Sequence, residues 1–339
     1  MYVAVPEQAG DAPAPAEPEG LSAFVARVLN QLSLSAWLPG AFFIVTSACI
    51  WWFRTRGAVT LSGLGAYVQA NWVPVLVLAL PSLVVATLLT QAFSFEAIRS
   101  LEGYWRTRGP ESLMRNIGIT WQAYRQQSLE KRLRRMVAKA FRKARPRLLA
   151  RGIDAAALLA VQADFDGDPR PTGFTKKQTK NAAALHISWL TDCDPRAAAT
   201  IQRVQRDLAE FPQYSRVMPT RLGNVLRTAE DRLRNLNGDL EGFVMAHRAV
   251  VPTRVLEHHD QFRTRLDMYC TLVFVAVAVA VLSVLAMWTL PMIGRILIPL
   301  VLLIMAWVSY RAAVSSARGY ATILGQIDDS IDRSNARPK

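Results

Sequence analysis

The chain has 339 residues, 51% of them hydrophobic, and its 40 Lys and Arg against 26 Asp and Glu give a net charge of +14. This apolar content is high for a soluble protein, and it is concentrated in two blocks, before residue 96 and after residue 267. Three cysteines without a CxxC pair exclude a disulfide framework. We therefore predict an all-α, polytopic membrane protein with four transmembrane helices and a central cytoplasmic helical domain.

The first 20 residues carry four acidic residues, four prolines and no basic residue. This composition predicts a disordered acidic tail over residues 1–20. Residues 21–96 begin with a short amphipathic helix from Leu21, of the kind that lies at a membrane surface. Two uncharged apolar stretches then predict the first span at about 34–53 and the second at about 72–95, each long enough to cross about 30 Å of hydrocarbon.

Residues 97–268 form the basic central domain, with 31 Lys or Arg against 18 Asp or Glu, a difference of +13. Two helix starts are marked, one by Asp194 with Pro195 and one by Thr220, and the second helix is expected to stop at Gly238. From Pro252 a helix should continue without a break into the third span. Between 111 and 151, apolar residues at helical spacing predict one stripe that faces a core: Ile117, Trp121, Tyr124, Leu133, Met136 and Ala140.

Nine basic residues lie between 131 and 147 with no acidic residue among them, beginning with Lys131, Arg132, Arg134 and Arg135. Three interpretations of this run compete. The first is a face toward anionic lipid, because each such charge near a cytoplasmic leaflet adds about 1 kcal/mol of attraction. The second is a solvated helix face without a ligand. Nucleic-acid binding is disfavoured, because no recognised binding module accompanies the charge.

Residues 269–312 contain the third and fourth spans, about 269–288 and 292–312, and residues 313–339 are predicted to form a C-terminal tail. Two spans on each side of the basic domain place that domain and both termini on one side, which the positive-inside rule assigns to the cytoplasm. Arg54 and Arg56, in the short outer loop, oppose this orientation. A seam of small residues in span three, Ala276, Ala280 and Ser283, favours close approach of another helix and motivates self-association.

Two polar segments supply interaction candidates. Arg99, Glu102, Tyr104 and Trp105 directly follow the second span and are expected to anchor the domain at headgroup depth. Arg221 and Asn224 are candidates for binding an anionic ligand, with structural hydrogen bonding as the alternative. The pairs Arg227–Asp231 and Glu230–Arg234 are four residues apart, which predicts ion pairs on the helix surface.

A family resemblance accompanies these segments. RSLEGYW after the second span, MPTRLGNVLRTAEDR, and the closing pair of spans followed by ARGYATIL together resemble a family of uncharacterised bacterial four-span membrane proteins of unknown function. The resemblance covers most of the chain after about residue 35 and implies a bacterial plasma (inner) membrane. Members often continue the second motif with a Tyr-Gly-rich turn and a Trp-Pro element, whereas this chain has NGDLEGFVMAHRAVVP there.

No catalytic, cofactor-binding or metal-binding signature is found in the sequence, such as HExxH, GxSxG or a P-loop. The string DFDGD resembles the start of a calcium loop, but Pro169 and Thr175 stand where the loop needs glycine and glutamate, so we expect a solvated turn. The four histidines are expected to have packing roles. No ionisable residue lies near the middle of a span, which disfavours a coupled transporter.

We therefore expect a non-enzymatic membrane-anchored scaffold or effector that acts through its basic cytoplasmic domain and needs no cofactor. Its expected partners are the lipid bilayer, through anionic headgroups, and an unidentified protein. One alternative is a homo-oligomeric channel or pore lined by neutral polar residues such as Thr46, Thr87 and Thr90, which otherwise bond between helices. A second alternative is a lipid-acting enzyme.

Overall fold

The computed structural model describes residues 34–169, 173, 175–234, 236, 240–288 and 291–335. This part of the chain is helical and contains no strand, so the predicted all-α class is confirmed for it. The predicted acidic tail and the amphipathic helix from Leu21 lie outside the described residues. The helices are α2 (Leu34–Arg56), α3 (Leu64–Ala70), α4 (Trp72–Glu102), α5 (Pro110–Ala150), α6 (Ala155–Asp166), α7 (Lys176–Ser188), α8 (Pro195–Leu208), α9 (Arg221–Arg232), α10 (Leu240–Ala246), α11 (Thr253–Ala286) and α12 (Met292–Asn335), with 3-10 turns η1 (Trp189–Asp192) and η2 (Tyr214–Arg216).

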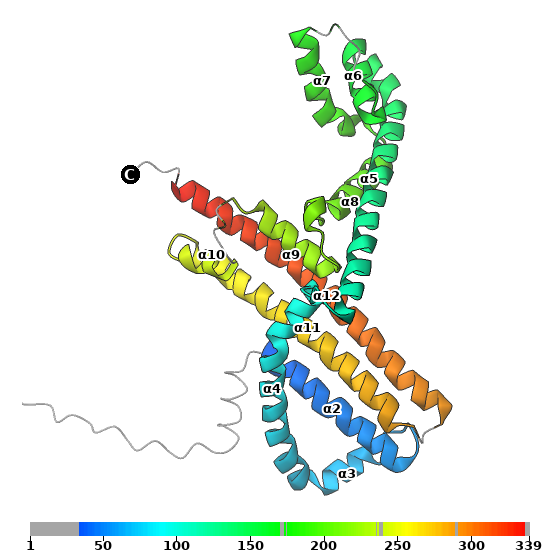
Figure 1. Cartoon of the computed structure of the whole chain (residues 1–339), viewed down its shortest axis with the longest axis vertical. Coiled ribbons are helices and arrows are strands. Elements are labelled where there is room, and N and C mark those ends of the chain that lie inside the picture. The colour runs from blue at the N-terminus through cyan, green and yellow to red at the C-terminus, as the bar shows by residue number, and fades with distance from the viewer. Residues whose placement is uncertain are drawn as a thin grey trace, which may run out of the picture.

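Three of these helices, α4, α11 and α12, are long and apolar enough to cross a membrane. Much of their apolar surface is not covered by other described residues; on α4, for example, Leu78 is 70% exposed. Apolar surface of this extent is rare on soluble monomers, which indicates a membrane protein. The stretch predicted as the first span coincides with α2, which lies beside α11 and α4 (Figure 1).

The apolar parts of α2, α11 and α12 pack around a common core. Ile50 of α2, Val279 and Ala280 of α11, and Leu302 of α12 belong to one buried cluster. The small-residue seam of α11 is buried, with Ala276, Ala280 and Ser283 almost fully covered. The seam therefore serves close packing within the chain, and it is not free for the self-association that the sequence suggested.

Both α11 and α12 continue as helices beyond their apolar parts. The predicted unbroken helix from Pro252 into the third span is confirmed, because α11 runs from Thr253 to Ala286. The segment predicted as a C-terminal tail is a continuation of α12 as far as Asn335. Ala313, Ala317 and Leu324 of this continuation are fully buried against α9 and α11.

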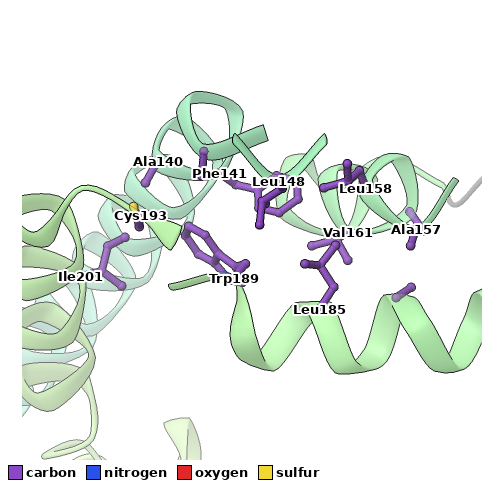
Figure 2. Packing of buried hydrophobic residues seen from close by; sticks show 13 residues of the cluster. Ala140, Phe141, Leu148, Ala157, Leu158, Val161, Leu185, Trp189, Cys193 and Ile201 are labelled. Carbon is purple, nitrogen blue, oxygen red and sulfur yellow. The ribbon is translucent and has the colours of Figure 1, made fainter. Parts of the chain in front are cut away.

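The far half of α5 carries a separate helical unit with its own core, formed with α6, α7, η1 and α8 (Figure 1). Phe141 and Leu148 of α5 are fully buried there, and Trp189 meets Phe141 edge to face with ring centroids 5.5 Å apart (Figure 2). We call this part the distal unit. Its helix start at Asp194 is confirmed, since the Asp194 carboxylate accepts a hydrogen bond from the amide of Arg196 at 3.2 Å.

The apolar stripe predicted along α5 is correct only in its second half. Leu133, Met136 and Ala140 pack into the core of the distal unit, whereas Ile117, Trp121 and Tyr124 are 61%, 65% and 67% exposed. The reason is helical phase: nine residues separate Tyr124 from Leu133, a rotation of about 900 degrees, which is two turns and a half. The two halves of the stripe therefore lie on opposite faces of α5.

Candidate functional site at the end of α4

The motif after the second span and the motif that opens α9 pack directly against each other. Gly103 ends α4 in the left-handed conformation, with φ of 95°. That conformation and the closeness of the Pro219 ring, which a β-carbon on Gly103 would overlap, both require glycine. In α9, Gly223 lies against the carbonyl oxygen of Glu102. We call residues 99–105 together with 216–231 the junction.

The hydroxyl of Thr220 joins the two helices of the junction. It accepts a hydrogen bond from the amide of Gly223 at 3.0 Å, which confirms Thr220 as the N-cap of α9. It also donates to the carbonyl of Glu102 at 3.0 Å, at the C-terminus of α4. One side chain thus satisfies backbone groups at the ends of both helices, groups that would otherwise be unpaired. Helix α9 ends at Arg232, before the predicted stop at Gly238, which lies outside the described residues.

Asn224 has a structural role at the junction. Its side chain is 2% exposed, its amide oxygen accepts from the backbone N–H of Met218 at 2.7 Å, and its amide nitrogen donates to the Met218 carbonyl at 3.2 Å. These two bonds fix the turn that precedes α9. Of the two interpretations of Asn224, structural hydrogen bonding is therefore the one that fits its contacts.

Ion pairs link η2 to α9, and α12 to the segment just after α9. Asp231 pairs with Arg216 of η2, Arg227 donates to Glu230 at 2.8 Å, and Arg234 reaches Asp332 of α12 at 3.0 Å. The pairs predicted between residues four apart, Arg227–Asp231 and Glu230–Arg234, are therefore wrong. Asp231 pairs with Arg216 of η2 instead, and Arg234 pairs with Asp332 of α12. These two pairs connect α9 and the residues just after it to neighbouring elements.

Glu102 lies past Phe95, where the apolar stretch of α4 ends, and it faces this charged network. Burial raises the pKa of its carboxyl to about 7; the negative charge of Glu230 adds to the rise, while Arg227 and Arg99 oppose it. Burial also raises the pKa of the Tyr104 phenol, although the positive charge of Arg227 acts in the other direction. Glu102 is thus a carboxyl whose charge changes near neutral pH.

The remaining anchoring candidates surround the end of α4. Trp105 donates its indole N–H to the carbonyl of Ser100 at 2.7 Å, which folds the chain back along the helix. The guanidinium carbon of Arg99 lies 6.0 Å from the centre of the Tyr104 ring, and that of Arg227 lies 5.6 Å from it, both within range of a cation–π contact. Together with Glu102, the side chains of Arg99, Tyr104 and Trp105 therefore lie around the end of α4, and their role as an anchor at headgroup depth stays a prediction.

The other side of α9 meets α12. Arg221 donates through Nε and Nη2 to Glu210 at 3.1 and 3.0 Å, and Arg318 of α12 pairs with the second oxygen of Glu210 at 2.6 Å. The backbone amide of Leu222 donates to the hydroxyl of Tyr310 at 3.3 Å. Arg221 is the only one of these residues that the sequence marked as a candidate for binding an anionic ligand. The others come from segments about 11 and 90 residues away, and no local pattern marks them.

The basic run of α5 is exposed and shares a face with the exposed half of the apolar stripe. At about 100 degrees per residue, Lys131, Arg132 and Arg135 lie in line with Ile117 and Tyr124, and Arg134 lies nearer the side. We call this side the open face of α5. Figure 1 shows α6, α7 and α8 packed along the far half of α5, and the end of α6 reaches Arg142 of the basic run through Asp166.

The DFDGD string ends a helix instead of forming a free turn. Asp164 and Asp166 belong to the last turn of α6, which Gly167 ends in the left-handed conformation. Asp166 pairs with Arg142 at 3.0 Å, beside an open groove of about 1100 Å³ between α5 and the end of α6. Among the described residues, no group of three His, Cys, Asp or Glu side chains could hold a metal ion.

His259 is buried between α11 and α12. Its ring nitrogens contact the Asp260 carboxylate at 3.0 Å and the Tyr320 hydroxyl at 3.3 Å. Next to it, Gly319 faces the ring of Phe262, which a β-carbon would overlap. Both Gly319 and Tyr320 belong to ARGYATIL, so the third motif fastens α12 to α11. The residues of the three motifs thus hold helices together.

Comparisons with family models, with curated proteins and with solved structures find no match to this chain.

Proposed function

We propose that the protein spans the bacterial plasma (inner) membrane four times and acts there as a non-enzymatic scaffold or effector, with both termini and residues 97–268 in the cytoplasm. In this proposal α2 is the first span, and its packing beside α4 and α11 supports that role. The net charge of residues 97–268 supports a cytoplasmic location under the positive-inside rule. The bacterial assignment rests on the resemblance of the three motifs.

The open face of α5 is the observation that carries the proposal. Its half nearer the junction exposes large apolar and aromatic side chains, and its continuation exposes basic ones. Exposed aromatic and apolar side chains suit the boundary between headgroups and acyl chains, and basic side chains near the membrane surface are attracted to anionic lipid. We propose that this face lies toward the cytoplasmic leaflet, so that α5 holds the distal unit in a fixed place for a protein partner.

Lipid crosslinking tests this placement. A photoreactive amino acid at Trp121 in proteoliposomes that contain phosphatidylglycerol should form lipid adducts, detected by mass spectrometry. The same amino acid at Asn116, also exposed but about 140 degrees around the helix, is the matched control and should form few. Equal yields at the two positions, or no adduct at Trp121, would contradict the proposal.

A conductance measurement separates the scaffold from a homo-oligomeric channel. Of the three pore candidates, Thr46 and Thr90 donate to carbonyls of their own helices at 2.5 and 3.0 Å, whereas the buried hydroxyl of Thr87 has no hydrogen-bond partner among the described residues. This bonding supports a structural role for the hydroxyls of Thr46 and Thr90. Liposomes that contain the protein should therefore conduct no more than protein-free liposomes, and stepwise currents would favour the channel.

A further inference from the structure

A groove of about 490 Å³ opens where the start of α9 meets α12. It lies apart from the open face of α5. Trp307 lies inside the apolar part of α12, Arg311 is one turn further on, and Arg318 lies seven residues beyond Arg311, about 10 Å along the helix. The groove thus extends from the edge of the apolar segment into the layer where headgroup phosphates lie. Its lining residues are Arg221, Trp307, Tyr310, Arg311, Val314, Ser315 and Arg318.

The charges around this groove do not balance. Three arginines line it, and the carboxylate that pairs with them is that of Glu210, which both Arg221 and Arg318 contact. Three positive charges and one negative charge leave +2. Arg311 pairs with no carboxylate in the described chain, and its guanidinium carbon lies 5.0 Å from the centre of the exposed Trp307 ring.

The groove is also held in shape before any ligand binds. Because Glu210 bridges Arg221 and Arg318, their side chains are fixed relative to each other. The bond from the Leu222 amide to Tyr310 fixes the start of α9 on α12. A rigid arrangement of arginines suits the bidentate bonds that guanidinium groups make with phosphate, and the aromatic ring beside it suits the boundary between headgroup and acyl chain.

We infer that this groove binds the phosphate of an anionic phospholipid, with Arg311 donating to the phosphate and the acyl chains passing beside Trp307. The inference rests on the proposed function in one respect only, that this end of α12 lies at a membrane surface. It differs from attraction to the open face of α5, because it assigns one lipid to one set of side chains.

Native mass spectrometry of the full-length protein in detergent tests the inference, with phosphatidylglycerol and phosphatidylcholine as probes. Arg311→Gln leaves the pairs of Glu210 intact, so the fold should be retained, and an unchanged melting temperature checks this. The variant should bind phosphatidylglycerol about tenfold more weakly, the size of one lost charge-assisted bond. Arg333→Gln, which removes the same charge from an exposed position farther along α12, is the matched control and should bind like the wild type.

Four outcomes would overturn the inference. The first is equal binding of the two lipids by the wild type. The second and third are an equal loss of phosphatidylglycerol binding in the two variants, and no loss of this binding in Arg311→Gln. The fourth is displacement of the lipid by equimolar inorganic phosphate, which would show a site for a soluble anion. The measurement in detergent depends neither on the orientation in the membrane nor on a protein partner. Failure of the lipid site and failure of the scaffold proposal are therefore separate results.

Discussion

Gly223 of α9 lies against the carbonyl oxygen of Glu102, the last residue of α4, so closely that a β-carbon would overlap it. The neighbouring Thr220 hydroxyl donates to the same carbonyl at 3.0 Å. This contact joins a helix that crosses the apolar region to a helix of the basic domain, and it needs a residue without a side chain. The position of the basic domain on the apolar bundle therefore depends on Gly223.

Replacement of Gly223 by alanine should destabilise the protein. The oxygen that a β-carbon would meet belongs to backbone, which cannot move aside as a side chain can, so we expect a loss of about 1–3 kcal/mol. The melting temperature in detergent should fall by several degrees. Gly325→Ala is the matched control, because a β-carbon at Gly325 in α12 meets open space and alanine favours a helix. If the two variants melted alike, the junction would not be as tight as described.

The ionisation of Glu102 should make stability depend on pH near neutrality. Its folded pKa, about 7, is above the ordinary value of 4.5, so between these values the folded protein holds a proton that the unfolded chain has lost. Stability should therefore be greatest below this range and should fall as pH rises through it, by on the order of 1–3 kcal/mol. Melting curves from pH 5 to 8 should show the decline, and Glu102→Gln should reduce it. A Gln variant with the wild-type pH profile would contradict this assignment.

Local signals predicted the helix starts because the atoms involved are neighbours in the chain. Thr220 caps α9 through an amide three residues away, and Asp194 caps α8 through one two residues away. The ion pairs could not be predicted in the same way. The rule for residues four apart treats a helix as isolated, but Arg216, 15 residues before Asp231, comes from another element and takes that carboxylate.

The candidate site was predicted in part for the same reason. Arg99, Glu102, Tyr104 and Trp105 are close in sequence and stay together in the fold. Their contact with α9 joins segments 118 residues apart, and a single sequence holds no signal for it. The exposed half of the α5 stripe was misassigned because helical spacing shows which residues share a face and does not show which face is covered.

The distal unit should depend on the aromatic core around Phe141 of α5. Phe141 is fully buried and contacts the rings of Phe165 and Trp189 at 5.3 and 5.5 Å between centroids. Phe141→Ala should cost about 3–5 kcal/mol and increase hydrogen exchange in α6 and α7. Leu149→Ala, at an exposed position of the same helix, should leave the exchange of both helices unchanged. Faster exchange in both variants would mean that α5 itself, and not the core, had been weakened.

The Thr220 hydroxyl should contribute more to the stability of the protein than an ordinary helix cap does, because it forms hydrogen bonds with two helices. Valine has nearly the same shape but can neither accept from the Gly223 amide nor donate to the Glu102 carbonyl. Thr220→Val should therefore lower stability by about 1–2 kcal/mol and speed hydrogen exchange at the first turn of α9. Serine keeps the hydroxyl, so Thr220→Ser should stay close to the wild type in both measurements. If serine were as damaging as valine, the methyl group and its packing would be responsible, and the hydroxyl would not be the link between α4 and α9.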